Sequence, residues 1–329
     1  MRQFEYTAAT DIRGATQAIS TKPGSAFIAG GTGLIDLMKL DVETPQQLVD
    51  INRLPFAEIT ENANHGLRIG AMARNSVVAW NPLVRERYPL LSESLLAGAS
   101  AQLRNMATVG GNLMQRTRCT YFRDVHETCN KRSPGSGCAA AEGHHRTHAI
   151  FGTSEHCFAT HPSDMCVALV CLSAVVEVQG PSGMRRIPIE DFHKLPHDTP
   201  QIETALARDE VITGIELPPP SGKSRSIYRK VRDRASYEFA LVSAAVLIET
   251  SAGMIDDVRI AFGGVATKPW RSAPAEKVLK GARADEAAFR SAAEAAVNGA
   301  LLHRDNKFKV ELLKRTLMLA LAEVTGEQR

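Results

Sequence analysis

Apolar residues along the chain recur in short blocks that predict a mixture of strands and helices. A Pro-Gly turn precedes an apolar strand at residues 26–29, and a glycine-rich turn then leads into a helix start at residues 34–39. Two more buried strands are predicted at residues 46–52 and 67–72. Leucine and alanine follow with helical spacing from residue 89 to 105, up to a second glycine turn, ATVGGNL.

The pattern resumes after an aperiodic stretch. Residues 161–180 contain an apolar run that ends in a strand, and the turn at residues 181–183 predicts a hairpin. The segment LPPPSGKSRS combines three prolines with small and charged residues, which is typical of a linker. We therefore predict one domain over residues 1–220 and a second over residues 221–329.

The sequence of the second domain predicts a sheet covered by helices. Strands are predicted within residues 226–250 and 254–266, joined by a turn around Ser251-Ala252-Gly253. Residues 274–302 are alanine-rich and helical. The final segment predicts a helix whose buried face carries Val310, Leu313, Leu317 and Ala320.

Composition and charge narrow the classes of function. The 329 residues suit about two domains. A net charge of +3 gives no reason to expect nucleic acid or a basic membrane contact, and no stretch approaches the roughly 20 apolar residues of a membrane span. The N-terminus lacks the apolar region of a signal peptide. We expect a cytoplasmic chain, or a periplasmic one if it is exported folded with a signal-bearing partner.

Two glycine turns are candidates for binding a phosphate group. Gly30, Gly31 and Gly33 let backbone amides approach a ligand without an intervening side chain. The sequence TVGGN, residues 108–112, offers a second such concavity. Neither turn matches GxGxxG or the Walker pattern, so two ordinary tight turns stay an alternative. Two similar turns on one domain nevertheless suit the two ends of a dinucleotide.

Four cysteines lie in the aperiodic stretch, which is polar and rich in glycine and proline. Cys119, Cys129, Cys138 and Cys157 are separated by nine, eight and eighteen residues. Zinc sites usually place two ligands within two to four residues, which is not the case here. Nearby histidines keep a Cys/His zinc site open, and a reducing cytoplasm disfavours disulfides. A 4Fe-4S cluster would need four thiolates from a loop free to wrap around it.

Five motifs in order resemble one known family. AFIAGGTGLIDLMK, QLRNMATVGGNLMQRTRC, HPSDM, DEVITGIELPPP and YRKVRDRASYEFALVSAAV occur in the order seen in FAD-binding subunits of the xanthine dehydrogenase family of molybdenum hydroxylases. The resemblance spans nearly the whole chain and is greatest to flavoprotein subunits of bacterial aldehyde oxidoreductases with a cysteine insertion, here about residues 114–160. It implies an α+β fold: a FAD-binding domain of the PCMH (vanillyl-alcohol-oxidase-like) type with two subdomains, then a CO-dehydrogenase-flavoprotein-like C-terminal domain.

The same resemblance implies a set of cofactor-binding residues. A first loop would hold the FAD pyrophosphate through its backbone amides, and a second loop would also bind FAD. An aspartate would bind ribityl or ribose hydroxyls, an isoleucine would pack against the isoalloxazine or the adenine, and a lysine would lie near the flavin. These residues are Phe27, Ile28, Ala29, Gly30, Gly31, Thr32, Gly33 and Leu34; Thr108, Val109, Gly110, Gly111 and Asn112; then Asp164, Ile212 and Lys230. An aromatic residue often found between the loops is absent from LAGASAQL. Without the resemblance, Lys230 would read as a solvated strand lysine.

The cysteine insertion resembles a 4Fe-4S site whose metal ligands are Cys119, Cys129, Cys138 and Cys157. We expect Cys166 and Cys171 to be core residues, because free cysteine packs well in apolar runs. Basic residues nearby would offset the cluster's negative charge: Arg116, Arg118, Arg123, Lys131 and Arg132.

Together these features predict an electron-transfer subunit of a heterotrimeric molybdenum-dependent aldehyde oxidoreductase, carrying FAD and a 4Fe-4S cluster. A large molybdopterin subunit would oxidise the aldehyde, a small subunit with 2Fe-2S clusters would pass electrons to this chain, and an external acceptor would receive them. We find no catalytic acid–base pair here. The last domain would dock partners or cover the flavin, with RDRASYEFA on one side of it. The alternatives are a zinc-stapled, non-catalytic interaction module and a free-standing flavin oxidoreductase.

Overall fold

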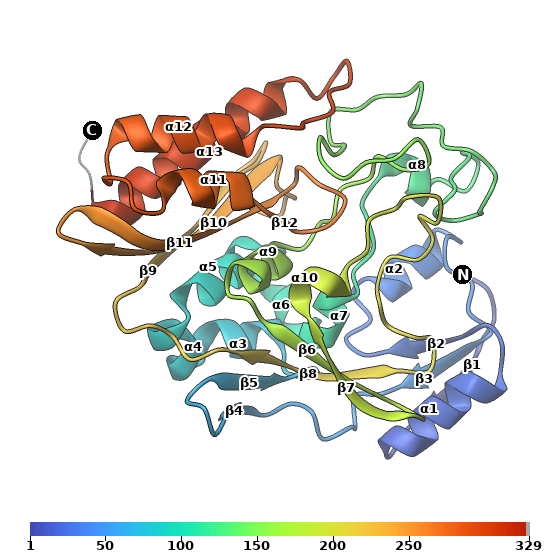
Figure 1. Ribbon diagram of the computed structural model, residues 1–329. Helices are drawn as coiled ribbons and strands as arrows, with labels where there is room; N and C mark the ends of the chain where they lie inside the picture. Colours follow the sequence, from blue (N-terminus) through green and yellow to red (C-terminus); the bar gives the residue numbers. More distant parts are fainter. Residues whose placement is uncertain (327–329) are drawn as a thin grey trace.

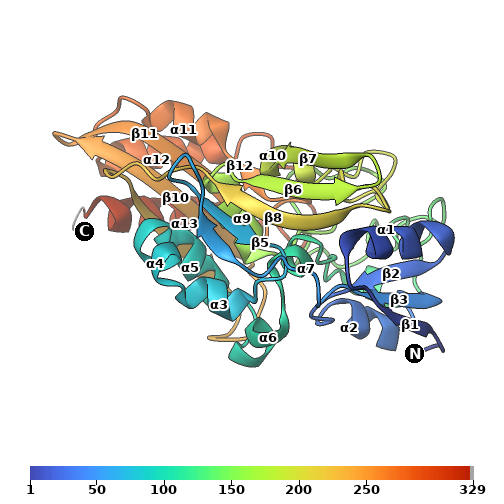
Figure 2. The same ribbon diagram turned by 90° about the horizontal axis from the view of Figure 1, so that it is seen from below.

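The computed structural model describes residues 1–326, and its elements are arranged around three β-sheets (Figure 1). The N-terminal sheet has three strands, the middle sheet five and the C-terminal sheet four. Figure 2 shows the N-terminal sheet at one end of the molecule and the C-terminal sheet with its helices at the other. Within this described part of the chain, no helix combines the length and the apolar character that crossing a membrane requires.

The N-terminal sheet is parallel and has the simplest connections. Its strands are β1 (Glu5–Ala8), β2 (Ser25–Ile28) and β3 (Gln47–Asp50), in the order β1-β3-β2, with helices α1 (Ile12–Thr21) and α2 (Leu34–Lys39) as crossovers. The Asp11 carboxylate caps α1 by accepting from the Gly14 N–H. Ile19 and Val49 pack in the core beneath. The glycine-rich turn thus lies between the end of β2 and the start of α2.

The middle sheet is antiparallel and is covered by short helices. The strands are β4 (Ile59–Glu61), β5 (Leu67–Gly70), β6 (Val175–Gly180), β7 (Gly183–Pro188) and β8 (Val211–Leu217), in the order β4-β5-β8-β6-β7. The helices are α3 (Asn75–Trp80), α4 (Pro82–Arg87), α5 (Pro89–Ala97), α6 (Ala101–Met106), α7 (Val109–Leu113), α9 (Asp164–Cys171) and α10 (Ile189–Phe192). Helix α9 is buried throughout and packs against α5.

The structure divides the helix predicted from residue 89 to 105 into α5 and α6. Gly98 has an extended backbone, and Ala99 adopts the left-handed region with φ of 51°. The Ser100 hydroxyl then caps α6 by accepting from the Leu103 N–H. Helical spacing of leucine and alanine continues across this break, which is why periodicity alone did not predict it.

The C-terminal sheet is antiparallel and packs between two layers of helices. It comprises β9 (Arg225–Val231), β10 (Val242–Ser251), β11 (Met254–Gly263) and β12 (Trp270–Arg271), followed by α11 (Ala273–Leu279), α12 (Glu286–Ala296) and α13 (Phe308–Thr325). On α13, Leu313, Leu317 and Ala320 are buried as predicted, whereas Val310 is only partly buried. The other face of the sheet contacts α5 and α9 of the middle layer. The predicted linker spans the end of β8 and the start of β9.

The cysteine segment is irregular, as predicted, except for the single turn α8 (Thr120–Arg123). Its C-terminal part is fixed to the C-terminal sheet: the Ile150 N–H donates to the Val265 carbonyl at 2.7 Å. Lys309 on α13 is fully buried, and its ammonium donates to the carbonyls of His148 and Gly264 at 2.9 and 2.6 Å. The segment therefore connects the FAD-loop region with the last domain.

Candidate cofactor sites

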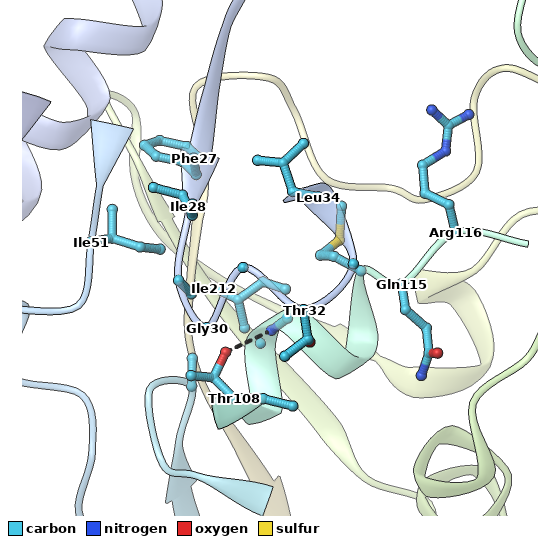
Figure 3. Close-up of a pocket in the computed structure, with 18 of the residues that line it drawn as sticks. Phe27, Ile28, Gly30, Thr32, Leu34, Ile51, Thr108, Gln115, Arg116 and Ile212 are labelled. Carbon is cyan, nitrogen blue, oxygen red and sulfur yellow. Dashed lines mark hydrogen bonds between the residues drawn. The ribbon is translucent and has the colours of Figure 1, made fainter. Parts of the chain in front are cut away.

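The turn between β2 and α2 forms part of a cavity of about 380 Å³ (Figure 3). All eight residues of the predicted first loop, residues 27–34, line it. Ile212 on β8 and Ile51 also line it, and Figure 3 shows both side chains beside Phe27 and Ile28. An apolar cavity of this kind suits a flat aromatic ring.

The backbone of the first loop presents hydrogen-bond donors that the protein itself does not use. Among the described residues, no acceptor receives a hydrogen bond from the N–H groups of residues 30–34. Gly31 has φ of 71°, a left-handed conformation that glycine adopts without cost. Successive N–H groups around such a residue form a concavity that binds anions. The loop is therefore suited to a pyrophosphate.

Gly30 allows the first loop to touch the second. A Cβ atom at this position would lie 2.0 Å from the Met106 carbonyl oxygen and 2.8 Å from the Met106 carbonyl carbon. Both atoms belong to the backbone at the end of α6, directly before the second glycine turn. The two turns are therefore in direct contact, as binding of one ligand by both requires.

The second turn differs from the prediction of another amide concavity. The Val109 N–H donates to the Ala73 carbonyl and the Gly110 N–H to the Ala71 carbonyl. Thr108 caps α7: its hydroxyl accepts from the Gly111 N–H at 3.1 Å, and its carbonyl accepts from the Asn112 N–H. The prediction of free amides was wrong because TVGGN forms a capped helix turn. In this turn, the N–H groups of residues 109–112 therefore all have partners within the protein.

A second cavity, of about 500 Å³, adjoins the first at the same loop. Thr32, Gly33 and Gly111 line both cavities. Asn112 and Asp164 line the second cavity only, whereas Val109 is fully buried and lines neither. A dinucleotide whose pyrophosphate lay at the shared loop would have space for one end in each cavity.

Asp164, the first residue of α9, is held by a buried network. Its Oδ2 accepts from the Lys230 ammonium at 2.9 Å, and its Oδ1 accepts from the Tyr228 hydroxyl at 2.7 Å. The side chain of Lys230 is only 4% exposed and also donates to the Ala97 carbonyl. Burial, with the nearby charge of Asp164, holds the pKa of Tyr228 well above its ordinary value. Lys230 is thus no solvated lysine, but it lines neither cavity.

All four cysteines of the aperiodic segment line one small cavity. Cys129 and Cys138 are paired there in an isolated antiparallel bridge of the backbone. The Cys119 sulfur lies 3.3 Å from Nε2 of the buried His148. Among the described residues all six cysteines are free thiols. Segments up to 38 residues apart in sequence therefore converge as a cluster site requires.

Burial affects the acidity of three of the four thiols. Burial raises the pKa of Cys119 to about 12 and also raises the pKa of Cys138 and Cys157. Four sulfurs bound to one zinc ion at about 2.3 Å would be about 3.8 Å apart. In the described chain, no three of the four sulfurs lie within 4.8 Å of one another. The sulfurs therefore do not have the spacing of a single zinc site.

A separate group of three potential ligands lies beside α9. Ligand atoms of His161, Cys166 and His193 are within 4.8 Å of one another. Nδ1 of His161 accepts from the Ser163 N–H at 3.3 Å, so in the neutral ring Nε2 carries the proton. Burial lowers the pKa of His161 well below its ordinary value, so the ring is neutral. Nδ1 of His161 is thus already engaged in a hydrogen bond, and we interpret the group as core packing.

The basic residues predicted to offset the cluster charge mostly have other partners. Arg118 and Arg123 both pair with Asp36, at 3.0 and 2.8 Å. Arg132 donates to backbone carbonyls, including that of Phe122 at 2.7 Å. Of the five, Lys131 is the one that lines the cysteine cavity. That all five residues offset the charge of a cluster therefore stays a prediction.

Sequence reasoning missed several residues of these sites. Tyr237 and Phe239 line the second cavity and supply the aromatic surface that LAGASAQL lacks. Both residues belong to RDRASYEFA, a segment that we expected beside the flavin. Because they are the two aromatic residues of that segment, the sequence could have indicated them. No feature of the sequence indicated Glu203, whose carboxylate forms ion pairs with both Lys131 and Arg116.

Comparison with known families gives two matches that together cover almost the whole chain. Residues 2–220 match the family described as "FAD binding domain in molybdopterin dehydrogenase". Residues 226–324 match "CO dehydrogenase flavoprotein C-terminal domain".

Individual proteins are similar over the same length. The chain is 50% identical to the aldehyde oxidoreductase FAD-binding subunit PaoB of Escherichia coli K12, covering 99% of this chain and all of that protein. It is 27% identical to the glyceraldehyde dehydrogenase medium chain of Sulfolobus acidocaldarius, covering 98% of each. Among solved structures, carbon monoxide dehydrogenase from Hydrogenophaga pseudoflava matches with a TM-score of 0.78 at 25% identity, covering 99% of this chain and 98% of the other.

Proposed function

Because the chain belongs to the FAD-binding subunits of the molybdenum hydroxylase family, an oxidoreductase family, we propose that it is the FAD- and 4Fe-4S-containing electron-transfer subunit of an aldehyde oxidoreductase. The observation that carries the proposal is the convergence of four cysteines on one cavity close in sequence to the FAD loops. Cys119 follows Asn112, the last residue of the second loop, by only seven positions. We propose an aldehyde as the substrate of the assembled enzyme because the 50% identical relative is named as a subunit of an aldehyde oxidoreductase.

The first loop would bind the FAD pyrophosphate through its free amides. The adenine would occupy the apolar cavity beside Ile212 and Phe27, and the flavin end would occupy the polar second cavity. There Asp164 would accept from ribityl hydroxyls, while Lys230 and Tyr228 hold its carboxylate in place. When bound, FAD supplies the ability to exchange electrons singly or in pairs.

Cys119, Cys129, Cys138 and Cys157 would hold the cluster, which supplies one-electron transfer when bound. Because burial raises the pKa of the Cys119, Cys138 and Cys157 thiols, binding of the cluster would release protons from them. His148 would orient the Cys119 sulfur, as residues behind a metal ligand commonly do.

In the assembled enzyme, substrate oxidation would occur on a large molybdopterin-binding subunit. A small 2Fe-2S subunit would deliver electrons, and an external acceptor would take them from this chain. We propose that the domains divide at residues 220 and 221, and that the C-terminal domain covers the flavin through Tyr237 and Phe239.

The test is to purify the chain with its natural partners under anaerobic conditions and count iron, zinc, molybdenum and flavin per complex. Replacing Cys129 with Ser should lower the iron count by about four atoms and leave flavin bound. Cys171→Ser is the matched control, because Cys171 is buried in α9 away from the cysteine cavity, and it should retain both. Zinc in place of iron would support the interaction-module alternative, and substrate turnover by this chain alone would support a free-standing flavin oxidoreductase.

A further inference from the structure

Two of the four cysteines in the small cavity are direct neighbours across the backbone. Cys129 and Cys138 face each other in an isolated antiparallel bridge. The hydrogen bond of this bridge joins the flanking residues, because the Ala139 N–H donates to the Thr128 carbonyl at 3.0 Å. The Cys129 N–H donates instead to the Ser136 hydroxyl oxygen at 3.2 Å. The two cysteines therefore form a non-hydrogen-bonded pair, in which facing side chains approach each other most closely.

A pair of this kind has the geometry that a disulfide requires. In a non-hydrogen-bonded pair the Cα atoms are about 4.5 Å apart. A disulfide joins Cα atoms that are roughly 4.4–6.8 Å apart. The side chains of Cys129 and Cys138 line the same cavity, so both lie on one side of the bridge. Rotation about the two Cα–Cβ bonds is then enough to bring the sulfurs together.

Hydrogen bonds of the intervening loop, residues 130–137, hold the two cysteines opposite each other. The Gly137 N–H donates to the side-chain oxygen of Asn130 at 2.9 Å, which closes the loop at its ends. The Ser133 N–H donates to the Cys129 carbonyl at 2.8 Å. These contacts use backbone groups and a polar side chain but no sulfur. They therefore fix the position of the pair whatever the thiols bind.

The two other cysteines of the segment have different neighbours. The Cys119 sulfur lies 3.3 Å from Nε2 of His148. Cys157 also belongs to an isolated bridge, but its partner is Ser154. In the part of the chain that the structure describes, one isolated bridge alone joins two cysteines. Although six cysteines allow many pairings, the fold thus selects a single pair.

We propose that Cys129 and Cys138 are a modification site, which forms a disulfide in the iron-free chain by exchange with a small-molecule disulfide such as glutathione disulfide. The partly exposed Cys138 sulfur displaces one glutathione, and the buried Cys129 sulfur then displaces the second. One S–S bond breaks and one forms. The two cysteines lose two electrons and two protons, and the two glutathione molecules gain them as thiols.

The disulfide would remove two of the four ligands proposed for the cluster. This consequence rests on the proposed function, whereas the disulfide itself does not. A chain that is oxidised before loading would need a reductant before it could bind the cluster. A loaded chain would be protected, because both sulfurs would already be bound to iron.

The experiment uses the full-length chain, treated with a chelator, fully reduced and then equilibrated with excess glutathione disulfide. The remaining thiols are alkylated, and tryptic peptides are identified by mass spectrometry. Cleavage after Lys131 and Arg132 separates the two cysteines, so their disulfide joins two peptides. The wild type should yield the Cys129–Cys138 disulfide with the other four cysteines alkylated. Cys138→Ser should lose it, whereas Cys171→Ser, a buried residue of α9, should retain it.

The wild-type result decides by itself, so a poorly folded variant does not obscure the test. The proposal is overturned if Cys129 and Cys138 stay alkylated, or if either pairs with Cys119 or Cys157. The purified complex tests the proposed function separately, and with iron bound it should form no disulfide until a chelator removes the iron. A wild-type complex without iron would refute the proposed function, yet its chain should still form the disulfide.

Discussion

Replacing Gly30 with alanine should weaken FAD binding, because the new methyl group has no space. Its Cβ would lie 2.0 Å from the Met106 carbonyl oxygen and 3.1 Å from the Ala107 Cα. Both are backbone atoms, so no side chain can rotate away, and the first loop must separate from the second turn. The amides of residues 30–34 would then lose their arrangement around the pyrophosphate.

The size of the effect follows from the cost of overpacking, which is about 1–3 kcal/mol for an added methyl group in a close-packed site. If this free energy destabilises only the FAD-bound state, the affinity for FAD drops by about 5- to 150-fold, because about 1.4 kcal/mol corresponds to a factor of ten. The same strain in the unliganded chain would lower its thermal midpoint.

Gly222→Ala is the control, because Gly222 lies in an exposed turn and lines neither cavity. No atom lies within 4 Å of a Cβ at Gly222, and its backbone is not in the left-handed region. The assay is flavin content after purification, followed by titration of the flavin-free complex with FAD and by thermal unfolding. Gly222→Ala should behave as wild type. Equal flavin affinity in Gly30→Ala and the wild type would refute the argument from loop contact.

Two further predictions concern buried charges. Asp164→Asn leaves Lys230 buried without its counter-charge and should cost about 3–5 kcal/mol of unfolding free energy, measured by urea denaturation; a cost below 1 kcal/mol would mean that Lys230 reaches solvent. For Lys309, burial lowers the pKa from 10.5 to about 7, so between these values the unfolded chain binds more protons than the folded one. Stability should therefore rise with pH across this window and fall as pH drops towards 7, and Lys309→Met should flatten that slope in unfolding curves.

Local features of the fold could be predicted from the sequence, whereas its long-range pairs could not. The apolar runs at β2, β3 and β5 and the glycine loop after β2 have clear sequence patterns. The break at Ala99 was missed because the apolar spacing continues across it, although Gly98 and Ser100 are typical residues at a helix end and a helix start. The second glycine turn was misread because glycines suggest free amides, while the preceding threonine caps them.

In the candidate sites, too, the sequence indicated single residues but not the partners that they contact. Resemblance to a family indicated Asp164 and Lys230 separately, but their ion pair joins residues 66 positions apart. Glu203 lies 87 positions from Arg116, in a loop with no motif. Such partners are set by tertiary packing, and a single sequence contains no periodic signal for them.

The anchoring of the cysteine segment has a consequence for the order of biogenesis. Three of its fixed points are Val265, Leu301, whose N–H donates to the Ile150 carbonyl, and Lys309. All three emerge from the ribosome after the last of the four cysteines. Until these residues have been synthesised, the cysteine segment is not fixed to the C-terminal sheet, although the residues that line the cysteine cavity are already present. If the cavity binds a cluster, as proposed above, we expect stable loading only after residue 309 has been made.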